Sequence, residues 1–188
     1  MKRNDRFYLY LKWPKYLAQW YAHEMYRMEH IDDDVLPPFV YDCDEEVRNM
    51  EPVKTRRGSA ERNILEQCLT KQPDAVPELP DKDATICIEI PNFLNKPACT
   101  YNYLPRSARE LLKCAVRTHF RTELIKYMNK VMFAGNRAPA TQEKQVEAFM
   151  EVNGIEYNET SIIAIKQTWR RLYWKDYKMS KANENTRD

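Results

Sequence analysis

An apolar stripe with the period of an α-helix runs from Arg106 to Val131 and constrains the fold more than any other feature. Its members recur every three to four residues, as the buried face of a helix requires. They are Ala108, Leu111, Leu112, Ala115, Val116, Phe120, Leu124, Tyr127, Met128 and Val131. The stripe predicts a long helix that packs against the core.

Two stretches have the alternating pattern of β-strands instead. RFYLYLKW (6–13) is rich in aromatic residues, and ATICIEIP (84–91) places three isoleucines on one face. Pro14 ends the first strand and begins a helix over 15–28, while Ser59 is a natural N-cap for a helix over 60–70. We therefore predict an α+β fold: a small sheet covered by helices, followed by a C-terminal helical module.

Composition changes suggest the domain organisation. We predict an α+β domain at 1–132, a linker at 133–141 that holds Gly135, Asn136 and Pro139, and a helical module at 142–188 with a basic final helix. Residues 29–50 contain eight acids and one Arg. They lack the calcium-loop pattern, so we interpret them as a solvated acidic loop rather than a metal site.

Several classes of function are excluded or disfavoured. Three glycines cannot build a Walker A loop or a dinucleotide fingerprint. Five cysteines without a C-x-x-C pair indicate reduced thiols in a cytoplasm, and no apolar run is long enough to span a membrane. His23 and His30 lack zinc-protease spacing, and no nucleophile lies beside a base in the sequence. We predict a protein that is not an enzyme, with no catalytic residues, metal or cofactor.

Charge differs between the two halves of the chain. Residues 1–100 carry 14 Lys or Arg against 18 Asp or Glu, whereas residues 101–188 carry 16 against 10. A basic C-terminal half favours an anionic partner, although an ordinary solvated surface explains the same numbers.

The C-terminal segment predicts a pair of helices joined by a short turn. A helix starting at Thr141 or Gln142 ends at Asn153-Gly154, and Asn158 caps the next helix. A helix, a glycine-containing turn and a basic helix resemble the helix-turn-helix DNA-binding proteins over residues 141–181. The alternative is a helical hairpin that buries Trp169 and has a solvated basic face.

The resemblance implies a non-enzymatic protein that binds double-stranded DNA, as a homodimer paired through the 106–131 helix. It implies contacts to bases or phosphates from Asn158, Thr160, Ser161, Lys166, Gln167, Arg170, Arg171, Lys175 and Lys178. YNYLP (101–105) and NETS (158–161) also resemble segments of uncharacterised proteins of Bacteroidota and their phages or mobile elements. That likeness implies a cytoplasmic setting. Together with the helix-turn-helix resemblance, it implies that the protein regulates transcription of such an element.

Two further groups of cations are candidates. Lys54, Arg56, Arg57 and Ser59 precede a helix start and suit a phosphate, but we favour a charged loop before a normal cap. Arg109, Lys113, Arg117 and Arg121 step by four along the long helix; we interpret them as residues at the border of the core rather than as a phosphate track. The alternative function is a protein-interaction or assembly module that uses the aromatic segments 6–13 and 169–177.

Overall fold

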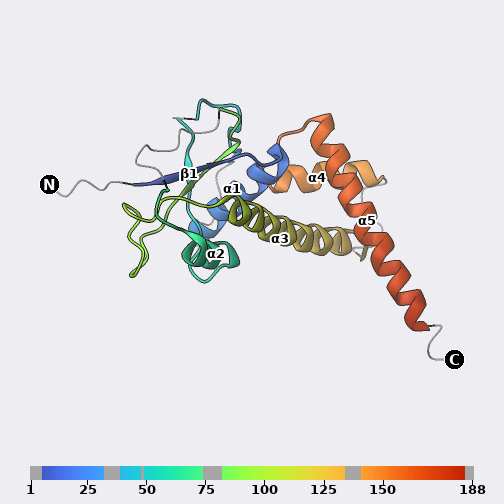
Figure 1. Cartoon of the computed structure of the whole chain (residues 1–188). Coiled ribbons are helices and arrows are strands. Elements are labelled where there is room, and N and C mark those ends of the chain that lie inside the picture. Colours follow the sequence, from blue (N-terminus) through green and yellow to red (C-terminus); the bar gives the residue numbers. More distant parts are fainter. Residues whose placement is uncertain (1–5, 32–38, 48, 74–81, 134–140, 185–188) are drawn as a thin grey trace. The chain divides into compact units, whose positions relative to one another are not determined.

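The computed structural model describes residues 6–31, 39–47, 49–73, 82–133 and 141–184, without the side chains of 131–133 and 174–184 (Figure 1). The chain divides into two compact units, Met1–Thr118 and His119–Asp188, and the division falls inside one long helix. Most of the predicted linker, 133–141, lies outside the described residues, so the domain boundary predicted there stays a prediction. No described helix combines the length and the apolar character of a membrane span.

The first unit contains a three-stranded sheet and confirms the α+β prediction. Strands β1 (Tyr8–Leu11), β2 (Pro52–Val53) and β3 (Ile86–Glu89) lie in the order β1-β3-β2. β3 pairs antiparallel with β1 and parallel with β2. The sequence did not reveal β2 as a sheet member, because two residues are too few to show alternation.

Helix α1 (Lys15–Glu29) follows β1 directly, as predicted, with Pro14 at its N-cap position. It is buried on every side from residue 17 to residue 25. One buried polar group in this stretch, Tyr21 Oη, has no hydrogen-bond partner among the described residues. Two others are paired: Gln19 Nε2 donates to Tyr41 O at 3.3 Å, and Arg27 Nη2 lies 2.7 Å from Glu24 Oε2. Such pairing is what allows polar side chains inside a core.

The predicted acidic loop is only partly solvated. Residues 32–38 and 48 lie outside the described residues, but Tyr41 and Cys43 are buried while the acids between and after them are exposed. Tyr41 Oη donates to Glu51 O at 2.9 Å and accepts from the Cys87 N–H at 3.1 Å. The loop is thus attached to β3 through Tyr41, while its described acids from Asp42 to Glu46 are exposed.

Helix α2 (Ala60–Cys68) has the predicted cap, because Ser59 Oγ accepts from the Arg62 N–H at 3.1 Å. Lys96 closes its other end by donating to Gln67 O at 2.9 Å and Leu69 O at 3.0 Å. A cation at this end also complements the helix dipole.

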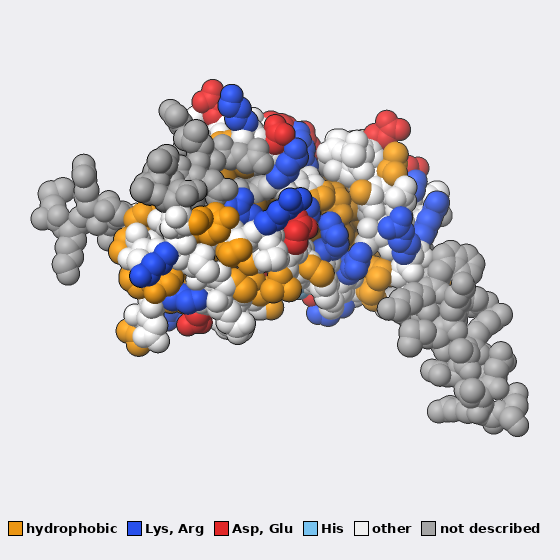
Figure 2. Space-filling view, in the orientation of Figure 1, with side chains coloured by type: hydrophobic (Ala, Val, Ile, Leu, Met, Phe, Trp, Pro, Cys, Tyr) orange, Lys and Arg blue, Asp and Glu red, His pale blue; other side chains and the backbone are white. Residues whose placement is uncertain are grey.

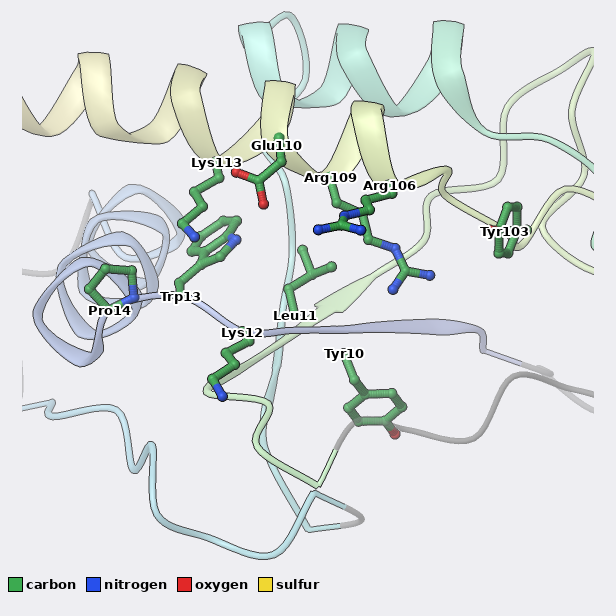
Figure 3. Close-up of a pocket in the computed structure, with 10 residues that line it drawn as sticks. All are labelled: Tyr10, Leu11, Lys12, Trp13, Pro14, Tyr103, Arg106, Arg109, Glu110 and Lys113. Carbon is green, nitrogen blue, oxygen red and sulfur yellow. The ribbon is translucent and has the colours of Figure 1, made fainter.

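Helix α3 (Arg106–Phe133) confirms the long helix, with one correction to its stripe. Positions four apart are buried: Ala108, Leu112, Val116, Phe120, Leu124 and Met128. Leu111, which we placed in the stripe, is 51% exposed because the helix directs Leu112 inward instead. In Figures 1 and 3, α2 and the start of α3 lie on the same side of β1.

The second unit packs α4 (Gln142–Val152) and α5 (Glu159–Glu184) with the end of α3. Phe149 of α4 contacts Phe120 and Tyr127 of α3, with ring centroids 5.8 and 5.2 Å apart. The predicted stop of α4 is a Schellman motif: Gly154 has φ +60°, and the Ile155 N–H donates to Met150 O at 2.9 Å.

Candidate nucleic-acid interface

A groove in the first unit gathers cations between α3 and β1 (Figure 3). Its volume is about 760 Å³. One wall is residues 10–14, which form the end of β1 and the turn into α1. The other comes from Tyr103 and the first two turns of α3, with Arg106, Arg109, Glu110 and Lys113. We call this the basic groove.

The α3 wall supplies most of the positive charge. Arg106, Arg109 and Lys113 are spaced three and four residues apart, so they share one side of the helix and extend toward β1 (Figure 3). Glu110 is the only acid among the described residues that line the groove. The α3 wall thus carries three cations against one carboxylate.

Arg109 is held in place by two neighbours. Its Nε donates to Leu104 O at 2.7 Å, and its guanidinium carbon lies 5.7 Å from the centroid of the Tyr103 ring. The hydrogen bond and the cation–π contact fix a flexible side chain over an aromatic face. The groove therefore contains a pre-positioned guanidinium, which lowers the entropy cost of binding an anion.

The β1 wall presents backbone groups. Leu11 O accepts from the Thr85 N–H at 2.9 Å and Phe7 O from the Ile90 N–H at 2.8 Å, so these alternate residues face β3. In an antiparallel ladder Tyr10 then directs its N–H and C=O to the open edge, and β1 is an edge strand of the described sheet. The Tyr10 and Lys12 side chains point away from α3 while Leu11 points toward it (Figure 3).

Lys12 and Trp13 complete this wall with their own contacts. Lys12 Nζ lies 2.8 Å from Asp83 Oδ2, and this hydrogen bond lowers the pKa of the Asp83 carboxyl. Trp13 is buried, with its ring edge-on to Tyr21 at 5.7 Å between centroids. Trp13 thus anchors the turn, whereas the polar character of the groove comes from its other residues.

The positive charge of the C-terminal half belongs to the region of α3. Residues 101–140 carry eight Lys or Arg and two Asp or Glu, whereas residues 141–188 carry eight of each. In Figure 2, Lys and Arg side chains gather among hydrophobic ones over the region of α3. The final helix, which we expected to be basic, carries six Lys or Arg against three Asp or Glu, and acids elsewhere in 141–188 balance that excess.

Most cations of α3 also lack ionic partners among the residues that the structure describes. Arg106, Lys113, Arg117 and Arg121 make no ion pair with any other residue that the structure describes. They are exposed or half-buried, so their apolar stems cover the helix while their charged ends reach solvent. Such charges are available to a polyanion without breaking a salt bridge.

The cations predicted on α5 are in a different situation. Lys166 Nζ lies 3.1 Å from Glu143 Oε1, and Arg170 Nε donates to Gln142 Oε1 at 3.4 Å. Both side chains are thus turned to the start of α4. Lys175 and Lys178 belong to the part of α5 whose side chains lie outside the described residues.

The other predicted contacts at the start of α5 divide into buried and exposed groups. Ser161 is 3% exposed, so it has no surface for a duplex, and Asn158 Oδ1 caps the helix by accepting from the Ser161 N–H at 2.8 Å. The structure thus forms the predicted cap, and among the predicted contacts whose side chains it describes on α5, Thr160, Gln167, Arg170 and Arg171 are exposed.

The predicted phosphate cluster before α2 is engaged elsewhere. Lys54 Nζ lies 3.2 Å from Glu29 Oε1, Arg56 contacts Met28 Sδ at 3.8 Å, and Ser59 caps α2. Arg57 is exposed. Lys54 and Arg56 thus both contact the end of α1, while Ser59 serves as the helix cap.

Sequence reasoning identified one wall of the basic groove and missed the other. The row Arg109, Lys113, Arg117 and Arg121 was visible in the sequence, but we interpreted it as the border of a core helix. The edge of β1 carried no signal, because only the tertiary fold brings residues about 90 positions away to α3. Tyr103, which lies just before α3, was not singled out either. No group of three or more His, Cys, Asp or Glu side chains within the described ranges is arranged to hold a metal.

Comparisons with known proteins found no matching family model, no significantly similar curated protein and no significantly similar solved structure. The function is therefore argued from the geometry of the basic groove.

Proposed function

We propose that this protein binds nucleic acid without catalysing a reaction, and that the basic face of α3 at the basic groove is the binding surface. The observation that carries the proposal is the row of cations Arg106, Lys113 and Arg117, none of which has an ionic partner among the described residues. Binding of phosphates by such groups releases counterions and is the main sequence-independent source of affinity for nucleic acids.

The spacing of the row supports a polymeric anion. Residues four apart on a helix lie about 6 Å apart along its axis, so Arg109, Lys113 and Arg117 present regularly spaced charges. Successive phosphates of a nucleic acid are regularly spaced as well. The carboxylates of an acidic protein surface are less regularly spaced, so binding such a surface requires fewer aligned cations.

A duplex contact through α5 is a second candidate. The capped start of α5 and the exposed Thr160, Gln167 and Arg171 favour it, as does the Gly154 turn, and the helix-turn-helix resemblance adds dimerisation through α3. Under this second candidate, the protein would regulate a phage or mobile element. The assembly-module alternative is supported by Leu94, which is 98% exposed.

Binding titrations at two salt concentrations test the proposal. A labelled oligonucleotide of about 16 nucleotides, as a single strand and as a duplex, is titrated at about 50 and about 200 mM salt. The combined substitution Arg106→Gln, Lys113→Gln and Arg117→Gln should make the slope of log K against log salt shallower by about two to three units.

The matched control removes the same charge from α5 through Lys166→Gln, Arg170→Gln and Arg171→Gln. It should leave the slope nearly unchanged. If the control loses the slope and the α3 variant keeps it, the interface lies on α5 and the proposal for α3 is wrong. If neither oligonucleotide binds at low salt, the nucleic-acid function itself is wrong.

A further inference from the structure

The shape of the basic groove narrows the kind of nucleic acid that fits it. A duplex meets proteins through projecting helices or ribbons that enter its grooves. The basic groove is instead a hollow of about 760 Å³, which is within the size range of small-molecule pockets. A hollow of this size can receive a nucleotide whose base is not paired.

The two walls match the two parts of an unpaired nucleotide. The cations of α3 suit the phosphates, whereas the open edge of β1 at Tyr10 offers one backbone donor and one acceptor. The Watson–Crick edges of bases in a duplex are already paired with their complements, whereas an unpaired base offers those edges to such groups. This pairing of a charged wall with a hydrogen-bonding wall favours a single strand.

Tyr103 and Arg109 add a flat surface to the same hollow. The guanidinium lies 5.7 Å from the ring centroid and is fixed by Leu104 O at 2.7 Å. Aromatic rings and guanidinium planes are the usual platforms on which unpaired bases stack. Because every base can stack, this surface favours single strands over duplexes but does not favour a particular base sequence.

The charge row distinguishes a polymer from a free nucleotide. Arg117 continues the row of Arg106 and Lys113 beyond the lining of the groove. A mononucleotide would fill the hollow without reaching Arg117, whereas a strand extends along α3. We propose that the basic groove holds unpaired nucleotides of single-stranded nucleic acid, with a base stacked at Tyr103 and Arg109 and the backbone following α3. This inference rests on the proposed nucleic-acid function.

The first experiment compares strand types by competition. A labelled single strand of about 16 nucleotides is displaced by the unlabelled single strand, its duplex or a nucleoside monophosphate. We expect the duplex to compete at least tenfold more weakly than the single strand, and the monophosphate more weakly still. Equal or stronger competition by the duplex overturns the inference while leaving the nucleic-acid function intact. Equal competition by the monophosphate also overturns it, and an acidic peptide that competes best overturns both.

The second experiment tests the stacking surface with two neighbouring tyrosines. Tyr103→Leu should weaken single-strand binding about tenfold, since loss of one base–aromatic stack has this size. Tyr101→Leu is the matched control: Tyr101 has cation–π neighbours of its own, Lys71 and Lys96, but does not line the groove. Tyr103→Phe keeps the ring and should restore binding. A folded Tyr103→Leu variant that binds like the parent overturns the inference.

A measurement on the unsubstituted protein covers the case in which Tyr103→Leu does not fold. A single strand carrying a photoreactive base is crosslinked to the protein, and the modified peptides are mapped by mass spectrometry. Crosslinks within residues 10–14 or 103–113 support the inference. Crosslinks confined to residues 158–171 overturn it and place the strand on α5.

Discussion

At the scale of single residues, the structure separates charges with internal partners from charges that meet solvent. Lys166 and Lys54 both carry the charge expected of a nucleic-acid contact, yet each lies within 3.2 Å of a carboxylate of the chain. Surface pairs of this kind add little stability, but they must be given up before a phosphate can bind. Arg106 and Lys113 have no such described partner, and this difference decides our choice of interface.

His23 provides a prediction about stability at low pH. It is 8% exposed, and burial, followed by the nearby Arg27 guanidinium, lowers its pKa below the usual 6.5, with Glu24 opposing the shift. The unfolded chain therefore takes up a proton before the folded one does. The free energy of unfolding should fall as the pH decreases below about 6.5, and it should level off below the folded pKa.

Denaturant titrations between pH 5 and pH 8, the range in which histidine charge changes, check this prediction. His23→Gln should make the free energy of unfolding depend less steeply on pH, since Gln does not titrate. An unchanged slope in a folded His23→Gln variant would contradict the assignment.

At the scale of elements, the helix ends follow local rules that can be identified in the sequence. Ser59, Thr141 and Asn158 each cap a helix through a side-chain oxygen, and Gly154 closes α4 with a positive φ. These signals act within four residues, so tertiary packing does not have to supply them. By contrast, the two-residue strand β2 exists only because β3 lies beside it.

Asn158→Ala tests whether this residue serves the helix or a ligand. Loss of the cap should lower the free energy of unfolding by about 1 kcal/mol, as measured by denaturant titration. Asn158→Ser restores an N-cap oxygen and should recover most of that loss. Nucleic-acid affinity should stay the same in both variants. A large loss of affinity in Asn158→Ala at unchanged stability would favour the α5 interface.

At the scale of the whole molecule, the charge pattern depends on where the chain is divided. A division at residue 100 assigns α3 and the final helices to one basic half, whereas the excess lies within 101–140. The distinction matters because affinity for a polyanion depends on local charge density rather than on the net charge of +2.

The order in which the five cysteine thiols are alkylated provides a test of the described fold as a whole. Cys99 and Cys114 are exposed, Cys68 is half-buried, and Cys43 and Cys87 are buried. Burial raises the pKa of the Cys87 thiol to about 12, so it is protonated and protected at neutral pH. We expect Cys99 and Cys114 to be alkylated first in the native protein, and Cys43 and Cys87 only on unfolding. Mass spectrometry after timed alkylation measures the order, and early modification of Cys87 would contradict the position of β3.

The sequence by itself determined the α+β class, the five helices and two of the strands of the described chain, because periodicity and capping are local properties. The sequence also showed the row of cations on α3, but it did not show that they lie at a groove. Leu111 was assigned to the wrong side of α3, and Lys166 was expected to be free, since burial and ion pairing depend on residues distant in the sequence. Only the tertiary structure placed the edge of β1 opposite Tyr103, Arg106 and Arg109, because a groove requires two walls and no local pattern encodes the second.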